Sequence, residues 1–203
     1  MLDNLTFFKQ TSWQDVFIAW KSQEGSDPVW QRFAKEEKGW ESWDAWRSHQ
    51  ARLINAAYRE WSICEIPDPN SIVPQFLMGP YRGWQKQYAE EEANTHTFAD
   101  LVRDNIQWVK ENIGVKTRTE NFPQSTQMIG VYAEDEGKII LYEGHHRATA
   151  IAFRVHEGDP IVFAENPTIA VVKMNGEDLS KFREMLYTST HKKDLKLQSH
   201  KVG

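Results

Sequence analysis

This sequence contains a single cysteine, has a negative net charge and lacks long apolar runs. Cys64 is the only cysteine in 203 residues, so no intrachain disulfide can form and a cysteine-rich zinc site is excluded. The formal net charge of -5 argues against an evenly basic protein that coats nucleic acid. The N-terminus lacks the pattern of a signal peptide, and no apolar stretch approaches the roughly 20 residues that span a bilayer. We therefore expect a cytoplasmic protein that does not enter membranes.

Tryptophan, by contrast, is abundant, and seven of the nine tryptophans precede residue 62. Trp13, Phe17 and Trp20 fall on one face of a helix, and Ser12 precedes them as a typical N-cap residue. Aromatic residues at this spacing are typical of a packed core, so we expect most of these tryptophans to be buried. The alternative is that they form an exposed surface that binds a protein partner.

Two further helical patterns follow in the same region. Asp27 and Pro28 have the arrangement of an N-cap and a first helical residue, which predicts a helix that continues to about Lys38. A broad apolar stripe over residues 41–61 predicts a third helix. We therefore expect residues 1–62 to form a tryptophan-rich region that is almost wholly helical.

From residue 63 onward the pattern changes to a mixture of helices and strands. Four of the eight prolines lie within residues 63–84 and predict an irregular connection, with a short strand over 61–66. The later segments predict a helix over 98–112 capped by Thr97, strands over 126–135 and 138–144, a helix over 145–158, a strand over 165–175 and a helix over 176–190. This order predicts an α+β fold over residues 63–190, with a small mixed sheet and packed helices, and a basic polar tail over 191–203.

The stretch LYEGHHRATAIAF, residues 141–153, places Gly144 between an expected strand and an expected helix. The first turn of a helix has backbone N–H groups without partners, and its positive dipole end attracts anions, phosphate in particular. A glycine here allows a ligand to approach the backbone closely. His145, His146 and Arg147 add side-chain donors, and three cations at a helix start are easier to explain if an anion lies there. The pattern therefore favours phosphate binding at this turn.

Two more polar residues flank the turn. Glu143 precedes the glycine, and its carboxylate is suited to bind a divalent metal or to act as a general base. Thr149 lies one helical turn after His145 and extends the polar face. The alternative is that the His-His-Arg run is only a solvated first turn. A zinc site built from both histidines is not expected, because adjacent helical residues point about 100° apart.

The segment GKIILYEGHHRATAIAF, residues 137–153, resembles the second conserved box of the ParB/sulfiredoxin-like superfamily. Members of that superfamily have a hairpin whose second strand runs into Gly-x-x-Arg at a helix start. The segment DPNSIVPQFLMGPYRGW, residues 68–84, is similar to the first box, with Tyr81 and Arg82 in the part that faces phosphates. The resemblance covers roughly residues 61–175.

What the resemblance implies is a pocket for the phosphates of a nucleoside triphosphate bound with Mg²⁺. The expected nucleotide-binding residues are Arg82, Gly144, His145, His146, Arg147 and Thr149. Glu143 and His146 are the expected catalytic residues, and Glu143 is also the expected Mg²⁺ ligand. Two departures from the pattern of the superfamily narrow the choice among the activities of its members. His145 stands where sulfiredoxins need a cysteine, and the chain after residue 175 is too short for the helix-turn-helix domain of partition ParB proteins.

Three hypotheses follow from the sequence. The first is an enzyme that cleaves or transfers a phosphoryl group of a nucleoside triphosphate, as an ATPase, a CTPase or a small-molecule kinase does. The second is a DNA-binding protein or nuclease, which the basic turn and tail support but the acidic net charge does not favour. The third is a non-catalytic module whose tryptophan-rich region binds another protein.

Overall fold

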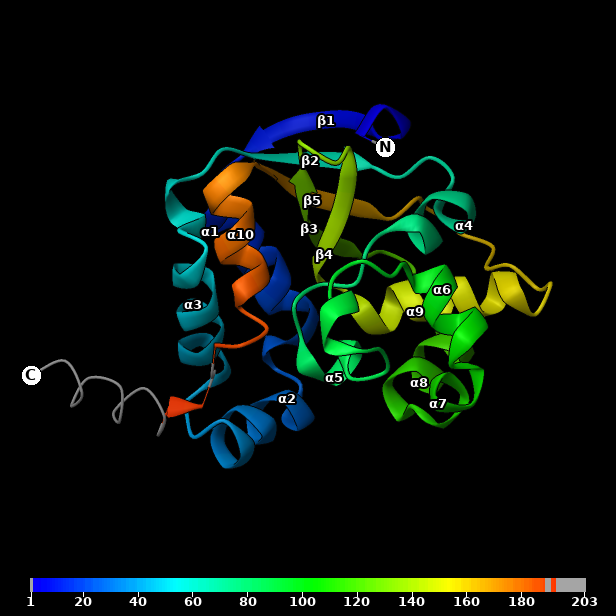
Figure 1. Ribbon diagram of the computed structural model, residues 1–203, viewed down its shortest axis with the longest axis horizontal. Coiled ribbons are helices and arrows are strands. Elements are labelled where there is room, and N and C mark those ends of the chain that lie inside the picture. The colour runs from blue at the N-terminus through cyan, green and yellow to red at the C-terminus, as the bar shows by residue number, and fades with distance from the viewer. Residues whose placement is uncertain (1, 189–190, 193–203) are drawn as a thin grey trace, which may run out of the picture.

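The computed structural model describes residues 2–188 and 191–192, and it contains one five-stranded mixed sheet with helices on both faces (Figure 1). The strands are β1 (Thr6–Thr11), β2 (Trp61–Glu65), β3 (Gln127–Ala133), β4 (Lys138–Glu143) and β5 (Thr168–Met174). The α-helices are α1 (Trp13–Trp20), α2 (Pro28–Arg32), α3 (Trp43–Leu53), α4 (Pro69–Ile72), α5 (Arg82–Gln85), α6 (Phe98–Asp104), α7 (Ile106–Glu111), α8 (Ile113–Glu120), α9 (His145–His156) and α10 (Gly176–Glu184). The α+β fold class predicted from the sequence is therefore confirmed.

The sheet has the strand order β1-β2-β5-β3-β4, in which β3 and β5 are the only neighbouring strands that run parallel. Helix α9 lies in the connection between β4 and β5. The short connection between β3 and β4 is an antiparallel hairpin, as expected around Glu136 and Gly137. This topology places the end of β4, where α9 begins, at one edge of the sheet.

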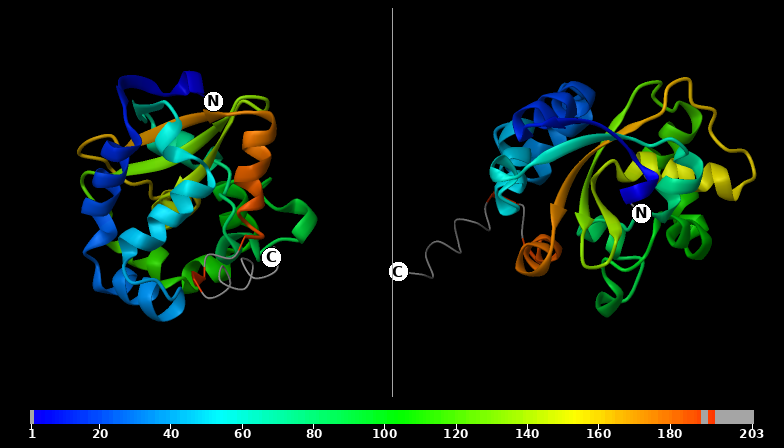
Figure 2. Two further views of the ribbon diagram at one scale, coloured as in Figure 1. Left: turned by 90° about the vertical axis from the view of Figure 1, so that its left-hand side faces the viewer. Right: turned by 90° about the horizontal axis from the view of Figure 1, so that it is seen from above.

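Two apolar cores lie on opposite faces of the sheet, because successive side chains of a strand point to opposite sides. On β3, Ile129 and Val131 face the core that includes residues of α1, α3 and α10. Met128 faces the other core, which includes residues of α6 and α9. Figure 2 shows these two groups of helices on either side of the strands.

The expectation that residues 1–62 are almost wholly helical is wrong at both ends. Residues 6–11 form β1, which pairs with β2 and gains its stability from that backbone pairing rather than from any local pattern. Residues 61–65 form β2, so the expected short strand is confirmed. The boundary expected near residue 62 falls inside this strand, and the helices before it share a core with the sheet.

The helices of this region begin where the sequence predicts. The side chains of Ser12 and Asp27 accept hydrogen bonds from the backbone N–H groups of Asp15 and Val29, and Pro28 follows Asp27 as the first helical residue. Both α1 and α2 run into π-helical turns, at Lys21–Gly25 and Phe33–Glu37. Five of the seven early tryptophans are buried, namely Trp20, Trp40, Trp43, Trp46 and Trp61, so the prediction that most of them are buried is confirmed.

The single helix predicted over 98–112 is wrong, because the chain forms two short helices there, α6 and α7, and α8 follows them. Thr97 caps α6 in a capping box with Asp100, as expected for its N-terminus. Asn105 then leaves the helical conformation, and the Asn112 side chain accepts a hydrogen bond from the Val115 N–H to cap α8. Asparagine favours such caps because its side chain competes with the helical backbone.

Helix α10 ends at Glu184, so the helix expected over 176–190 is shorter than predicted. Most of the expected basic tail, residues 193–203, lies outside the described residues. In the part of the chain that the structure describes, no helix is long and apolar enough to cross a membrane.

Candidate functional site

Gly144 directly follows β4, which ends at Glu143, and it is the N-cap of α9, so it lies between a strand and a helix as the sequence predicts. Its φ angle is 109°, a conformation that residues with a side chain rarely adopt. A Cβ atom at this position would lie 2.7 Å from Cγ of Met128 on β3. Glycine is therefore required here by the close packing of the turn against the neighbouring strand.

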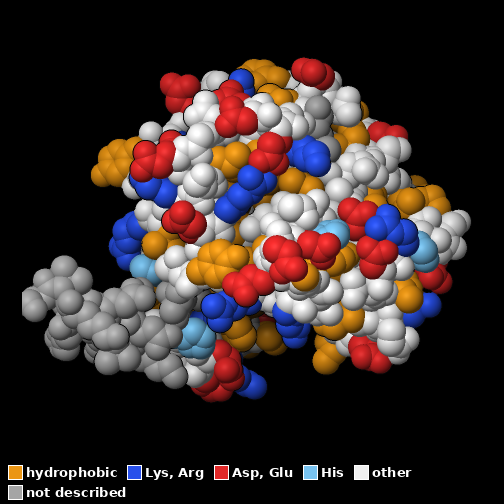
Figure 3. All heavy atoms as spheres, in the orientation of Figure 1, with side chains coloured by type: hydrophobic (Ala, Val, Ile, Leu, Met, Phe, Trp, Pro, Cys, Tyr) orange, Lys and Arg blue, Asp and Glu red, His pale blue; other side chains and the backbone are white. Residues whose placement is uncertain are grey.

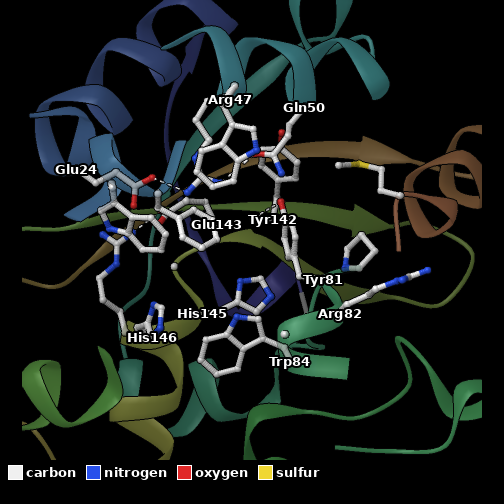
Figure 4. Close-up of a pocket in the computed structure, with 18 of the residues that line it drawn as sticks. Glu24, Arg47, Gln50, Tyr81, Arg82, Trp84, Tyr142, Glu143, His145 and His146 are labelled. Carbon is white, nitrogen blue, oxygen red and sulfur yellow. Dashed lines mark hydrogen bonds and ion pairs between the residues drawn. The ribbon is translucent and has the colours of Figure 1, made fainter. Parts of the chain in front are cut away.

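The first turn of α9 opens onto a pocket of about 810 Å³. Segments far apart in the sequence form its walls. They are the π-helical turn after α1, the α2 region, helix α3, the segment 80–84 around α5, the α8 region, and residues 185–188 after α10. The volume lies within the range of about 300–1,000 Å³ that is typical of small-molecule sites. Figure 4 shows Arg47 and Gln50 at one end of the view and His145, His146 and Trp84 at the other.

The guanidinium of Arg147 is held by protein groups. Its Nη2 contacts the Glu143 carboxylate in an ion pair, and both side chains are about nine-tenths buried. Its Nη1 donates to Gln23 Oε1 at 2.6 Å, to the Thr126 hydroxyl and to the carbonyl of Gln127 at 3.2 Å. The expected role of Arg147 as a bidentate phosphate ligand is not favoured, because these partners occupy its donors.

The two histidines are neutral rather than cationic. Burial, the neighbouring His146 and Arg47 lower the pKa of His145 to about 3, and its Nε2 accepts a hydrogen bond from the Gly79 N–H at 2.9 Å. Burial and the charges of Arg118 and Arg147 lower the pKa of His146 to about 4. The sequence argument from three cations is therefore wrong, and the anion beside the remaining cation, Arg147, is Glu143 of the chain itself.

Glu143 lines the pocket at the end of β4. Burial raises the pKa of its carboxyl above the ordinary value, the charge of Arg147 opposes this, and the charge of Glu24 adds to it. A carboxylate with a raised pKa is a better proton acceptor at neutral pH than an ordinary one. Its position is thus compatible with the general-base role that the sequence suggests.

The other two expected binding residues differ in their positions. Arg82 lines the pocket from α5, and its Nε donates to the carbonyl of Leu186 at 3.2 Å. Thr149 is not among the lining residues. Its side chain is fully buried, and its hydroxyl donates to the backbone carbonyl of His145 at 2.8 Å. The structure therefore does not favour the expected contact between Thr149 and a ligand, because the hydroxyl is buried and already bonded within α9.

Sequence reasoning missed a polar group that the N-terminal helices contribute. Glu24 accepts hydrogen bonds from Nη2 of Arg47 at 2.9 Å and from the Trp43 indole at 3.2 Å. The Arg47 guanidinium lies 3.9 Å from the ring centroid of Trp46, within cation–π distance. The dense tryptophans around Arg47 were a signal, because an arginine among aromatic residues is often held in such a cage, but nothing local linked it to Gly144.

Positive charge dominates the pocket although the chain is acidic. Among the described residues, five lysines and arginines line the pocket, Lys38, Arg47, Arg82, Arg118 and Arg147, against two glutamates, Glu24 and Glu143. Arg47 and Arg147 pair with these glutamates. Lys38, Arg82 and Arg118 thus leave an excess of positive charge that an anionic ligand can neutralise.

The described residues do not favour a metal ion held by the protein alone. No group of three or more His, Cys, Asp or Glu residues within the described ranges is arranged to hold a metal ion. Glu24 and Glu143 each pair with an arginine, and a cation at either carboxylate would have to displace it. The expected role of Glu143 as a direct Mg²⁺ ligand therefore fits this geometry poorly.

In comparisons with known proteins, the chain matches no family model, no curated protein and no solved structure. The resemblance to the ParB/sulfiredoxin-like superfamily stays a prediction from the motif around Gly144.

Proposed function

We propose that the protein binds a nucleoside triphosphate in this pocket and cleaves or transfers a phosphoryl group. The excess of positive charge beside the first turn of α9 carries the proposal. Lys38, Arg82 and Arg118 supply three positive charges that the glutamates of the pocket do not neutralise. A triphosphate is an anion of similar charge, and a helix N-terminus with nearby cations is a common way to bind phosphate.

Arg118 is the cation best suited to contact the phosphates. It lies on α8, which packs against α9, and it lines the pocket together with His146. In the described part of the chain, no carboxylate forms an ion pair with Arg118. Its five N–H donors are therefore available to phosphate oxygens.

The aromatic walls of the pocket suit a nucleobase. Trp30, Phe33 and Trp46 line it from the N-terminal helices, and Trp84 lines it from α5. Bases stack on such rings irrespective of their identity. Acidic and basic side chains are interspersed on the face shown in Figure 3, so the nuclease hypothesis is not favoured.

Phosphoryl transfer depends mainly on positioning and charge stabilisation. In this proposal the cations hold the phosphates, and Glu143 accepts a proton from the attacking water or hydroxyl group. His146, the other expected catalytic residue, is neutral, and its lowered pKa of about 4 makes it a weaker proton acceptor than Glu143. Mg²⁺ enters the proposal only as a partner of the phosphates, because both carboxylates already hold arginines.

Replacement of Arg118 by alanine tests the proposal. We expect Arg118→Ala to weaken triphosphate binding about 10-fold to 100-fold, the usual loss for a hydrogen bond between charged groups. Lys116→Ala is the matched control, because Lys116 is an exposed cation on the same helix and does not line the pocket. Binding is measured by titration with ATP, GTP, CTP and UTP in the presence of Mg²⁺, with phosphate release followed in parallel. Absence of binding for all four nucleotides, or equal affinities in the two variants, would refute the proposal.

A further inference from the structure

His145 is the first residue of α9, and the proposed function gives its side chain no role. The imidazole is 7% exposed and lines the pocket. Aromatic rings surround it, and the ring centroids of Tyr81, Trp84 and Phe98 lie 5.2 Å, 5.3 Å and 5.5 Å from its own. Figure 4 shows the imidazole beside Trp84. This packing restricts the orientation of the ring.

One ring nitrogen of His145 is anchored to the backbone. Nε2 accepts a hydrogen bond from the N–H group of Gly79 at 2.9 Å. Gly79 is buried, and no other group in the described residues accepts this N–H, so a flipped ring would leave it without a partner. A nitrogen that accepts from a backbone N–H carries no proton, so the ring is neutral and its single proton is on Nδ1. The low pKa of about 3, caused mainly by burial, agrees with this state.

The protonated nitrogen of His145 is open to the pocket. Nδ1 has no hydrogen-bond partner in the part of the chain that the structure describes, and it is not shut off from solvent. By covalent geometry Nδ1 is the ring nitrogen nearer to the main chain, so its N–H lies beside the backbone N–H groups of the first turn of α9. Those backbone groups have no partner within the helix. The first turn thus presents a cluster of donors that includes a neutral side chain.

We infer that His145 is a neutral hydrogen-bond donor to an oxyanion in the pocket, the phosphoryl group of the proposed substrate; this inference rests on the proposed function. Nδ1–H donates to a phosphate oxygen that the backbone N–H groups of the first turn bind at the same time. A neutral donor suits this position, because the positive end of the helix dipole disfavours a cation. Since the ring exchanges no proton with the phosphate, Glu143 is left as the proton acceptor of the reaction.

Titration of the wild-type protein and of two His145 variants with ATP and inorganic tripolyphosphate tests the inference. His145→Gln keeps an acceptor for the Gly79 N–H but has no N–H at the position of Nδ1, so we expect its affinity for both probes to fall about 10-fold to 100-fold. His145→Asn can place an amide N–H near the position of Nδ1 and should regain part of this affinity. His156→Gln is the matched control, because His156 is exposed on the same helix and does not line the pocket.

The outcomes separate the inference from the proposed function. If the wild-type protein binds both probes and a folded His145→Gln variant binds them equally well, the inference is wrong and the proposed function stands. If the wild-type protein binds neither probe, both are wrong. A loss of affinity in His156→Gln as large as that in His145→Gln would also overturn the inference, because it would show that the loss is not specific to the ring at the pocket.

Nuclear magnetic resonance of the imidazole nitrogens provides a test that needs no variant. At neutral pH we expect the signals of His145 to be those of a neutral ring with its proton on Nδ1. Saturating tripolyphosphate should shift the Nδ1–H signal, because the group then donates to a phosphate oxygen. A proton on Nε2, a doubly protonated ring in the free protein, or an Nδ1–H signal that bound tripolyphosphate leaves unchanged would each overturn the inference.

Discussion

Removal of the arginine from the buried Glu143–Arg147 pair should destabilise the fold strongly. The side chains of the two residues are 11% and 9% exposed, so a lone carboxylate at Glu143 would be largely cut off from water. Loss of one partner of a buried ion pair typically costs about 3–5 kcal/mol, because the other charge remains buried without compensation. We expect Arg147→Met to lower the free energy of unfolding by about this amount at neutral pH.

The double variant Glu143→Gln/Arg147→Met distinguishes this explanation from simple loss of packing. It removes both charges, so we expect it to be more stable than Arg147→Met alone. The matched control is Lys21→Met, which breaks the ion pair with Asp44. The side chains of that pair are 51% and 40% exposed, and we expect a loss of less than about 1 kcal/mol.

Urea unfolding measures these differences. With an m value of about 2 kcal/mol/M, a loss of 4 kcal/mol shifts the midpoint by about 2 M. The loss in Arg147→Met should be smaller at pH 5 than at pH 8, since burial raises the pKa of the Glu143 carboxyl and its neutral form needs no partner. A loss below 1 kcal/mol in Arg147→Met, or a double variant less stable than the single one, would contradict our account of the pair.

Two further changes test the turn before α9. The wild-type protein should lose about 2 kcal/mol of stability through His145 between pH 7 and pH 5. In the unfolded chain this histidine takes up a proton below its ordinary pKa of about 6.5. In the folded protein its pKa is about 3, so it stays neutral over this range. Unfolding free energies at pH 7, 6 and 5 measure this, and a His145→Asn variant with an equally steep pH profile would speak against the assignment. Gly144→Ala should cost about 2–4 kcal/mol, from the positive φ angle and the contact with Met128. Gly158→Ala is the matched control, because Gly158 also has a positive φ angle but has open space around the new Cβ. Thermal unfolding compares the two variants, and an equal loss of stability in both would show that the Met128 contact does not matter.

The local features of the fold could be predicted from the sequence. Ser12, Asp27 and Thr97 mark helix starts correctly, because a cap depends on a side chain and a backbone N–H only two or three residues away. The start of α9 after Gly144 could be predicted for a similar reason, since the hairpin and helix around it have clear periods of two and 3.6 residues. The division of 98–112 at Asn105 is a local feature that this reasoning missed.

The electrostatic state of the site was beyond such reasoning. His145 and His146 can become cations near neutral pH by residue type, yet burial lowers the pKa of both and keeps them neutral. Arg147 is a typical phosphate ligand by residue type, yet Glu143, Gln23 and Thr126 hold it. Burial and pairing depend on which distant segments pack against the turn, and the local sequence does not specify them.

The sequence by itself determined the α+β class, the helix caps and the turn at Gly144, because each depends on contacts between residues close along the chain. Only the tertiary structure decided that β1 joins the sheet and that Gln23, Glu24, Arg47 and Gln50 line one pocket together with the start of α9. Gln23 and Arg147 are 124 positions apart and are joined by a hydrogen bond of 2.6 Å. Contacts over such separations arise from the packing of whole elements against the sheet, and this packing sets the charge and the binding capacity of the candidate site.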